Sequence, residues 1–380
     1  MDADQSREPE PLWVRPYRRI AVLGGGAWGT ALAIVAAEAG RHARLWARAP
    51  ETCEEINRRH RNSHYLDDIP VPPSLHATPD MADACEGAEA VLLVTPSGTV
   101  RAIAEELDRV LAPGVPVVVC AKGIEDDTGY LMADVVQHAA PGRPVGALSG
   151  PSFAKETARG DPTAVTVASD FAHDPDRAPE EQLATRMAVS MTTGSFRPYV
   201  SDDLTGVEVG GAVKNVLAIA CGMATGAGFA ANTRAALITR GCDEMKVLAE
   251  ALGGRRETVT GLSGMGDLVL TCSNDASRNF SYGVEYGRGK RGSEIFDGRN
   301  VVVEGHRNAV AATELARRHG IHMPICETVR AVVHEGAPLG EAFAALWSRP
   351  LEAEPRALDL VFAHPADRGA IRRFAAAWEE

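Results

Sequence analysis

The stretch IAVLGGGAWG, residues 20–29, decides how the chain begins to fold. Its apolar first half is typical of a buried strand, and Gly24, Gly26 and Gly29 form the spacing GxGxxG. The first glycine of this spacing allows a tight turn, the second lets backbone approach a pyrophosphate, and the third lets a helix pack close to the strand. Because the helix that follows offers free N–H groups and a positive field, the pattern predicts a dinucleotide-binding turn.

The sequence beyond this turn supports a βαβ unit. An Ala-rich helix is expected to end at Gly40, and a second strand is expected at residues 43–47. Further short apolar runs, separated in several places by helix-like segments, occur at residues 90–94, 115–120, 145–148 and 164–168. Near-continuous apolar strands that alternate with helices are typical of a parallel sheet covered on both faces.

The pattern changes near residue 200, after which long helical segments dominate. They are expected at residues 207–223, 233–253, 278–289, 306–319 and 325–335. We therefore predict a Rossmann-like α/β domain with a mostly parallel sheet at residues 19–202 and an all-α domain at residues 203–348. A loose N-terminal extension is expected at residues 1–18 and a C-terminal extension at residues 349–380. In the latter, an amphipathic helix with Ile371, Phe374 and Trp378 on one face would suit packing or a subunit contact, as in a homodimer.

The overall composition argues against several classes of function. The 380 residues include 39 Lys plus Arg against 51 Asp plus Glu, and this net charge of -12 argues against binding to nucleic acid or to anionic membranes. The 7 cysteines form neither a CxxC pair nor a Cys/His cluster, which suits reduced thiols in the cytoplasm and indicates no metal site. No secretory signal is visible, and the uncharged stretch at 215–233 is interpreted as a buried helix rather than a membrane span.

Lysine is rare in this arginine-rich chain, which draws attention to the positions that keep it. These positions are Lys122, Lys155, Lys214, Lys246 and Lys290. Lys214 lies at the start of a strongly apolar helix, where desolvation would lower its pKa toward the range useful for proton transfer. Lys122 follows a strand at the sheet edge where ligands of open α/β sheets bind. A lysine snorkelling to the surface, or one simply solvated at a strand end, would give the same pattern.

Two further residues and one short segment are candidates for the functional site. Asp267 lies inside the apolar run GMGDLVLTC, where a buried carboxylate needs a partner, and a lysine is a candidate. The segment SRN at 277–279 precedes a helix, an arrangement that suits a phosphate, although capping alone would explain Ser277 and Asn279. Arg48 follows the second strand where NAD-specific sites usually place an acid, so it favours NADP(H) or use of both cofactors, unless it is a solvated surface residue.

Taken together, these motifs resemble those of the bacterial NAD(P)-dependent glycerol-3-phosphate dehydrogenases. The resemblance covers roughly residues 18–348. The matching segments are GGGAWGTALA at 24–33, TPS at 95–97, CAKGIE at 120–125, SGPSFAKE at 149–156, the run from VGGAVKN at 209 to residue 241, GMGDLVLTC at 264–272, SRN at 277–279, VVEG at 302–305 and MPICE at 323–327. One departure is Gly98, which stands where members often carry a larger polar residue.

The resemblance implies a role for each matching residue. It makes Lys214 the catalytic acid/base, and Asp267 plausibly orients that lysine and its proton network. The residues implied to contact the substrate are Lys122, Gly150, Ser152, Lys214, Asp267, Ser277, Arg278 and Asn279. Those expected to bind the cofactor are Gly24, Gly26, Ala27, Trp28, Gly29, Arg48, Lys122, Ala154, Arg278, Val302 and Glu304.

The function implied is the interconversion of dihydroxyacetone phosphate and sn-glycerol 3-phosphate by NADP(H), and also by NAD(H), in the cytoplasm and for glycerophospholipid synthesis. Two other interpretations stay open. A 3-hydroxyacid or 6-phosphogluconate dehydrogenase would share the two domains and a Lys-Asn pair, although the SRN segment and the run at 209–241 count against it. A non-catalytic NADP(H) sensor would need neither Lys214 nor Asp267.

Overall fold

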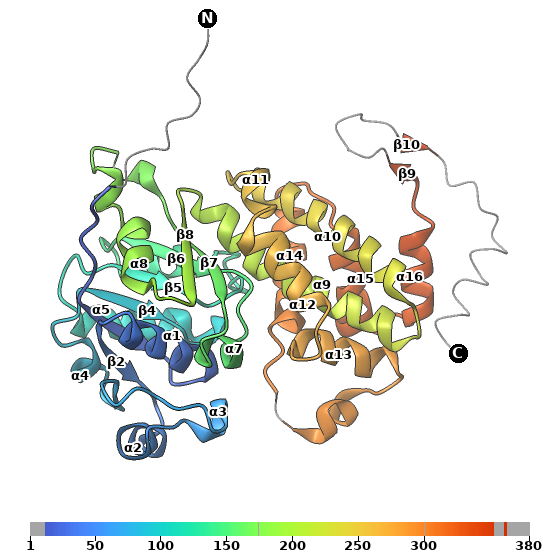
Figure 1. Cartoon of the computed structure of the whole chain (residues 1–380). Helices are drawn as coiled ribbons and strands as arrows, with labels where there is room; N and C mark the ends of the chain where they lie inside the picture. The colour runs from blue at the N-terminus through green and yellow to red at the C-terminus, as the bar shows by residue number, and fades with distance from the viewer. Residues whose placement is uncertain (1–11, 174, 300, 353–360, 363–380) are drawn as a thin grey trace, which may run out of the picture.

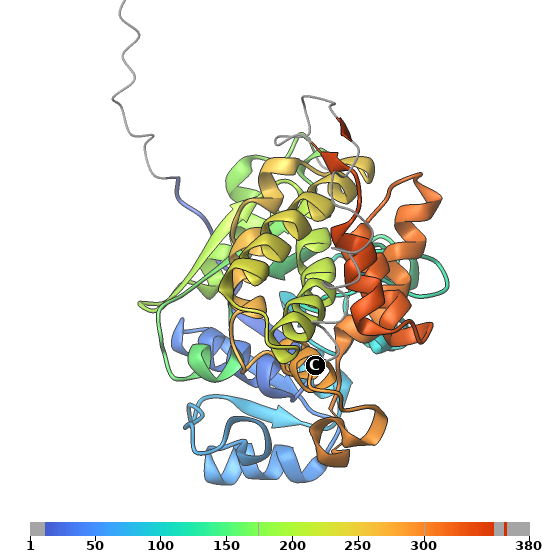
Figure 2. The same cartoon turned by 90° about the vertical axis from the view of Figure 1, so that its right-hand side faces the viewer.

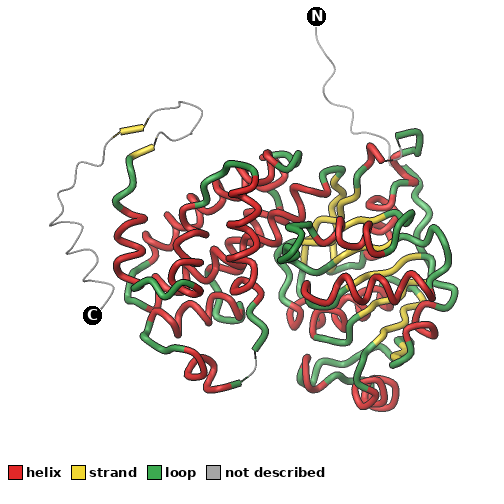
Figure 3. The backbone as a smooth tube through the Cα atoms, turned by 180° about the vertical axis from the view of Figure 1, so that it is seen from behind, coloured by secondary structure: helices red, strands yellow, loops and turns green. Residues whose placement is uncertain are grey.

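The computed structural model describes residues 12–173, 175–299, 301–352 and 361–362. Figure 1 separates the strands and their helices, in one half of the molecule, from the bundle of α9 to α16 in the other half. Seen from behind, the strands are confined to one half, apart from the short pair β9 (Leu351–Glu352) and β10 (Val361–Phe362) (Figure 3). This is the predicted fold class, a Rossmann-like α/β domain followed by a helical one.

An eight-stranded sheet with the order β3-β2-β1-β4-β5-β6-β7-β8 forms the first half. The strands are β1 Arg19–Leu23, β2 His42–Trp46, β3 His76–Thr78, β4 Ala90–Leu93, β5 Val117–Val119, β6 Val145–Ser149, β7 Thr163–Ser169 and β8 Phe196–Ser201. Neighbours pair in parallel except β6 and β7, which pair antiparallel. The carboxyl ends of β1, β4 and β5 therefore meet at one edge, and the functional residues follow these ends.

Successive residues of β1 contribute to two separate cores, one on each face of the sheet. Ile20 and Val22 pack with the apolar face of α1, whereas Ala21 and Leu23 pack with α5 and α6. Both faces are covered, which is why these strands are apolar without alternation. The helices of this half are α1 Ala27–Glu38, α2 Pro50–Arg59, α3 Ser63–Leu66, α4 Met81–Cys85, α5 Val100–Val110, α6 Met132–Ala139, α7 Ala154–Ala158 and α8 Leu183–Met191.

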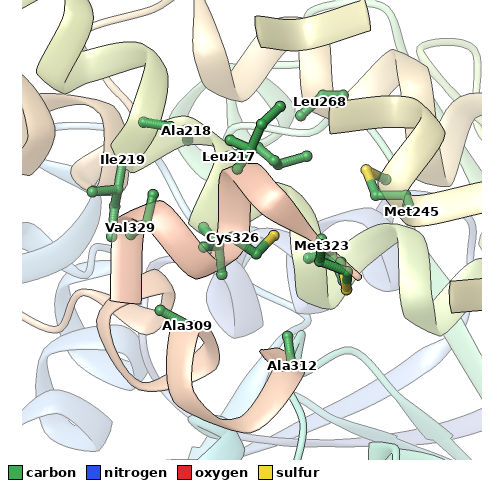
Figure 4. Close-up of a cluster of buried hydrophobic side chains, with 14 of the residues drawn as sticks. Leu217, Ala218, Ile219, Met245, Leu268, Ala309, Ala312, Met323, Cys326 and Val329 are labelled. Atoms are coloured by element: carbon green, nitrogen blue, oxygen red, sulfur yellow. The ribbon is translucent and has the colours of Figure 1, made fainter. Parts of the chain in front are cut away.

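Helix α9 (Leu204–Gly226) is the central element of the second half, and Figure 2 shows this bundle facing the viewer. Asp203 caps its start by accepting a hydrogen bond from the backbone N–H of Gly206 at 2.8 Å. The other helices are α10 Ala231–Ala251, α11 Arg256–Val259, α12 Asp267–Cys272, α13 Arg278–Gly287, α14 Glu304–Arg318, α15 Pro324–His334 and α16 Leu339–Trp347. Their core gathers Leu217, Met245, Val329 and neighbouring side chains (Figure 4).

The observed elements match most of the predicted ones to within a few residues. The predicted strands at 43–47, 90–94, 145–148 and 164–168 and the five predicted helices all have counterparts. The sequence analysis did not identify β3 and β8, nor the short helix α12, which begins at Asp267. β3 and α12 are too short to establish a periodicity, whereas β8 contains Pro198 and has mostly exposed or partly exposed residues, so it lacks the apolar run of the other strands.

Within the described residues, α9 alone is long and apolar enough to cross a membrane. Of its apolar window, 94% is buried inside the helical half, where it packs against α10, α12, α13 and α14. The predicted buried helix at 215–233 thus corresponds to the second half of α9, followed by a turn and the start of α10.

The two predicted extensions lie only partly within the described residues. In the N-terminal one, Tyr17 is buried, and its backbone N–H donates to Ser190 Oγ at 2.7 Å. The amphipathic stripe of Ile371, Phe374 and Trp378 lies outside the described residues, and the domain limits at 19–202 and 203–348 stay a prediction. All seven cysteines are buried and free.

Candidate functional site

The glycine turn after β1 has the geometry that a pyrophosphate requires. Gly24 has a φ of +130°, which side-chain-bearing residues rarely adopt, and a Cβ on Gly29 would lie 1.8 Å from the carbonyl oxygen of Gly24. A Cβ on Gly26, by contrast, would meet nothing within 4 Å. Gly26 is the N-cap of α1, so the open space lies at the end of the helix where N–H groups are free. The turn can therefore hold a dinucleotide phosphate.

Two arginines near the end of β2 differ in their partners. Arg44 pairs with Asp83 at 3.1 Å and with Glu86 at 3.2 Å, so its charge is already compensated. Arg48 is exposed in the loop before α2, and its guanidinium has no hydrogen-bond or ion-pair partner among the described residues. Of the two, Arg48 is the arginine that remains available to an anionic ligand beyond the glycine turn.

A buried cluster of charges lies where the two halves of the molecule meet. Asp267, at the start of α12, binds Lys214 of α9 through Oδ1 at 2.5 Å and Lys122, which follows β5, through Oδ2 at 2.6 Å. The exposed fraction of the side chain is 2% for Asp267, 7% for Lys214 and 16% for Lys122. Two cations share one carboxylate, so the cluster carries a net positive charge that an anionic substrate can compensate.

The surroundings of Lys214 lower its pKa. Burial lowers the pKa of Lys214 from 10.5 to about 8, because it penalises the charged ammonium, and the charge of Lys122 adds to this effect. The opposing charge of Asp267 limits the decrease. An ammonium with a pKa near 8 can both give and take a proton close to neutral pH.

The pKa values of two carboxyl groups in the site are shifted in opposite directions. Burial would raise the pKa of Asp267, but the charges and hydrogen bonds of Lys122 and Lys214 outweigh it and leave that pKa below its usual value. Burial does raise the pKa of Glu304, at the start of α14, although Arg278 and both lysines act against it. Asp267 is therefore the ionised partner that holds the lysines.

Local backbone features place these side chains. A π-helical turn at Leu262–Gly266 leads into α12, and a Cβ on Gly210 of α9 would lie 2.7 Å from the carbonyl oxygen of Ser263 in that turn. Only glycine at position 210 lets α9 approach so closely. Short π-helical segments of this kind occur often at functional sites. The close approach sets Asp267 beside Lys214.

The segment at 277–279 is brought to the same region by the packing of α13 on α9. Ser277 caps α13 by accepting from the N–H of Phe280, and Arg278 is exposed without a hydrogen-bond or ion-pair partner among the described residues. Asn279 is buried. It donates to Asn215 Oδ1 at 2.9 Å and accepts from the N–H of Gly305 at 2.9 Å, which leaves one amide N–H of Asn279 for a ligand.

The remaining predicted residues lie around these two centres. The carbonyl oxygen of Gly150 accepts from Lys122 Nζ at 3.3 Å and from Ser152 Oγ at 3.0 Å, so the loop after β6 contacts the charged cluster. Ala154 is the first residue of α7, which packs against α1 behind the glycine turn. Val302 is half exposed just before Glu304. Ala27 and Trp28 are partly buried in the first turn of α1.

Two side chains of the cluster escaped the sequence analysis. Thr271 Oγ1 accepts from Lys214 Nζ at 2.8 Å, and it lies one helical turn after Asp267. Asn215 donates to Glu304 at 3.3 Å and accepts from Asn279. The spacing of four residues between Asp267 and Thr271 would have revealed the first, had α12 been recognised as a helix.

A glycine-turn α/β domain, joined to a helical domain that supplies a buried lysine and an aspartate, defines a nicotinamide-dependent dehydrogenase. Models of the N-terminal and C-terminal parts of NAD-dependent glycerol-3-phosphate dehydrogenase match residues 19–174 and 203–344. The chain belongs to this family of NAD-dependent glycerol-3-phosphate dehydrogenases.

Individual relatives agree with this assignment. A glycerol-3-phosphate dehydrogenase [NAD(P)+] of Parvibaculum lavamentivorans is 49% identical over 338 residues, which span 89% of this chain and 98% of the relative. One of Rhodospirillum rubrum is 46% identical over 336 residues, which span 88% and 93%. The crystal structure of glycerol-3-phosphate dehydrogenase from Coxiella burnetii superposes with a TM-score of 0.79 at 36% identity, over 88% of this chain and 99% of that one.

Proposed function

We propose that the Lys122–Asp267–Lys214 cluster is the catalytic centre at which this NAD(P)-dependent dehydrogenase interconverts dihydroxyacetone phosphate and sn-glycerol 3-phosphate. The observation that carries the proposal is the buried carboxylate of Asp267, which binds one lysine through each oxygen. A dinucleotide held at the glycine turn would supply the hydride for the C2 carbonyl carbon and would itself be oxidised to NAD(P)⁺. The oxygen of that carbonyl then needs one proton to become the hydroxyl of the product.

Lys214 donates that proton. Its lowered pKa makes the transfer to a developing alkoxide favourable, and the same lysine in its neutral form accepts the proton in the reverse direction. Asp267 keeps Lys214 aimed, and Thr271 Oγ1 fixes a second N–H of the same ammonium. The positive charge of Lys122 stabilises negative charge that develops on the substrate oxygen.

The phosphate end of the substrate would bind the segment Ser277–Asn279. Arg278 has a free guanidinium, and the buried amide of Asn279 keeps one N–H. The backbone N–H groups in the first turn of α13 add a positive partial charge. The overall charge of -12 repels a phosphate at long range, so these local groups must reverse the field at the site.

The cofactor would lie from the glycine turn toward the charged cluster. Gly24, Gly26 and Gly29 shape the pyrophosphate site, and Arg48 suits a 2′-phosphate, which favours NADP(H) over NAD(H). Lys122 lies beyond β5, two strands from β1, which is about 10 Å at the usual strand spacing. The other cofactor contacts proposed are Ala27, Trp28, Ala154, Arg278, Val302 and Glu304.

Oxidation of NADPH by the purified protein with dihydroxyacetone phosphate tests the proposal directly. Consumption of one NADPH per sn-glycerol 3-phosphate formed is expected, and NADH should support the same reaction. No turnover with this substrate, together with turnover of a 3-hydroxyacid, would favour the hydroxyacid dehydrogenases. NADPH binding without any turnover would indicate a sensor.

We also propose a cytoplasmic homodimer whose product enters glycerophospholipid synthesis. Seven buried free thiols are compatible with a reducing compartment. The exposed apolar residues Tyr199 and Val200 on the edge strand β8 offer one surface for self-association. Light scattering at micromolar concentration would distinguish a dimer from a monomer.

A further inference from the structure

Helix α14 contacts the segment that carries Lys122. The buried side chain of Asn308 donates through Nδ2 to the carbonyl oxygen of Ala212 at 3.0 Å and to that of Lys122 at 3.4 Å. Ala212 lies two residues before Lys214 in α9, whereas Lys122 follows β5 of the α/β half. One amide therefore joins the backbones beneath both lysines of the catalytic cluster.

Neighbouring residues of α14 hold the same segment farther along. Arg307 forms an ion pair with Asp126, and Arg318 donates to the carbonyl oxygen of Thr128 at 2.7 Å. Leu315 lies 3.5 Å from the position that a Cβ on Gly129 would take. Residues 307, 308, 315 and 318 are separated by one, seven and three positions, which places them within about 100° of one another around the helix axis, on one face. This face fixes the segment at 122–129.

The absence of a side chain at Gly98 leaves space for this contact. Gly98 stands in the turn after β4, and a Cβ there would lie 2.2 Å from Nη1 of Arg307. The guanidinium thus occupies the space of a side chain at position 98. The ion pair of Arg307 with Asp126 is largely exposed, and pairs of this kind contribute little on their own. Asn308 is only 1% exposed, so its buried hydrogen bonds contribute more to the contact than the exposed ion pair does.

We propose that Asn308 is a positioning residue for the reduction, which fixes the distance between Lys122 and Lys214 by holding the carbonyl oxygen of Lys122 and that of Ala212, two residues before Lys214. It touches neither substrate nor cofactor. A buried amide donor that serves two carbonyl oxygens from different domains has no simple substitute. This inference rests on the proposed function, because it assigns Lys122 and Lys214 to the catalytic centre.

The consequence for catalysis follows from the arrangement around Asp267. If Asn308 no longer holds Lys122, the second oxygen of Asp267 loses its partner, and Lys122 no longer repels the charge on Lys214. The groups that face Lys214 are then Asp267 and Glu304, both of which raise its pKa. Loss of the contact should therefore weaken substrate binding and move the basic limb of the pH profile upward.

Asn308→Leu tests this proposal, since it keeps the branched shape of the side chain and removes both donors without adding a charge. A tenfold or greater rise in KM for dihydroxyacetone phosphate is expected, with a smaller change in kcat. The basic limb of kcat/KM should also move to higher pH. Thr313→Val is the matched control, because Thr313 is buried on the same helix and bonds the carbonyl oxygens of Ala309 and Val310. It should leave KM and the pH profile unchanged.

A measurement without turnover separates this proposal from the proposed function. The chain has only five lysines, so mass spectrometry can follow the acetylation of each one. Lys122 should react at least threefold faster in Asn308→Leu than in the native protein, with the exposed Lys155 as the internal reference. Absence of turnover in the native enzyme would refute the proposed function, whereas faster labelling of Lys122 would still support the positioning role.

A milder variant covers the case in which Asn308→Leu does not fold. Asn308→Ser keeps one hydroxyl donor and should give an intermediate rise in KM. Native KM, pH profile and Lys122 labelling in either folded variant would overturn the proposal. Failure of both variants to fold would overturn it too, since Asn308 would then be a residue of fold stability alone.

Discussion

The glycine turn and the charged cluster lie at the same edge of the sheet, but they are built in different ways. The turn is made of backbone from six consecutive residues, 24–29, and its decisive property is space that no side chain fills. The cluster is made of three side chains, from the segment after β5, from α9 and from α12, separated by 53 to 145 positions in sequence. Local geometry determines the first, and the packing of two domains determines the second.

Because of this difference, substitutions in the turn and in the cluster should impair the enzyme in different ways. A change in the turn alters a steric fit and should affect cofactor binding alone, because no titratable group takes part. A change in the cluster removes a charge from a buried network, which alters both the chemistry and the pKa values of the residues left behind. Variants in the two regions should therefore differ in kind as well as in size.

Removal of Lys214 is expected to have the largest effect. Lys214→Ala should lower kcat by about two orders of magnitude or more, which is typical for loss of a general acid. The dissociation constant of NADPH, measured by fluorescence titration, should stay nearly the same because the glycine turn is untouched. Lys290→Ala, a change on the surface, is the control. A variant that keeps more than about a tenth of the native kcat would exclude Lys214 as the proton donor.

The second prediction tests the empty space in the turn. Gly26→Ala should fold normally, because its φ is -76° and its Cβ meets nothing within 4 Å. The added methyl group would stand where the pyrophosphate approaches, so the NADPH dissociation constant should rise roughly tenfold or more, about 1.4 kcal/mol. Gly194→Ala is a control for the loss of a glycine outside the site, because its Cβ also meets nothing within 4 Å and its φ is not positive. Native NADPH affinity in Gly26→Ala would place the cofactor elsewhere.

The same contrast explains what the sequence could predict. The role of Gly24, Gly26 and Gly29 could be predicted because the turn is local. The long helices could be recognised from their periodicity and most strands from their continuous apolar runs. Lys214 and Asp267 stood out as charges in apolar runs, but their mutual contact depends on α12, whose six residues carry no helical period. The resemblance to a known family, rather than the pattern itself, joined them into one site.

Other parts of the site depend on contacts that a sequence pattern does not contain. Gly222 and Gly226 of α9 face Gly283 and Gly287 of α13, where each Cβ would lie 2.1–2.3 Å from a carbonyl oxygen of the other helix. The predicted helix at 207–223 ended before Gly226, whereas α9 continues through Gly226, and all four glycines serve close packing. The orientation of Asn279 toward Asn215 follows from this packing, and no local pattern could have predicted it.

The third prediction is a pH dependence that belongs to the cluster alone. With a pKa of about 8, Lys214 is protonated at lower pH and can act as the acid. For carbonyl reduction, kcat/KM should be level below pH 8 and fall roughly tenfold per pH unit above it. For oxidation of sn-glycerol 3-phosphate the sign reverses, because the neutral amine is the base, and kcat/KM should rise up to pH 8. NADPH binding to the turn should not follow this titration. Identical profiles in both directions would contradict the assignment.

The smallest effect is expected at Arg48, on the rim of the glycine turn. Arg48→Asp replaces an unpaired cation with an anion that would face the 2′-phosphate, so NADPH should bind more weakly while NADH changes little. Because Arg48 is exposed, the low end of the usual value for a hydrogen bond to a charged group applies, about 1.5 kcal/mol, which corresponds to roughly a tenfold loss of NADPH affinity.

Arg44→Ala supplies the matched control for this change. Arg44 lies four residues earlier but already pairs with Asp83 and Glu86, so its removal should leave the preference between the two cofactors intact. The measurement is the ratio of kcat/KM for NADPH and NADH at fixed dihydroxyacetone phosphate, taken for the native protein and both variants. Equal losses for the two cofactors in Arg48→Asp would mean that Arg48 supports the loop before α2 and does not read the 2′-phosphate. The preference between NADPH and NADH would then have to come from groups other than Arg48.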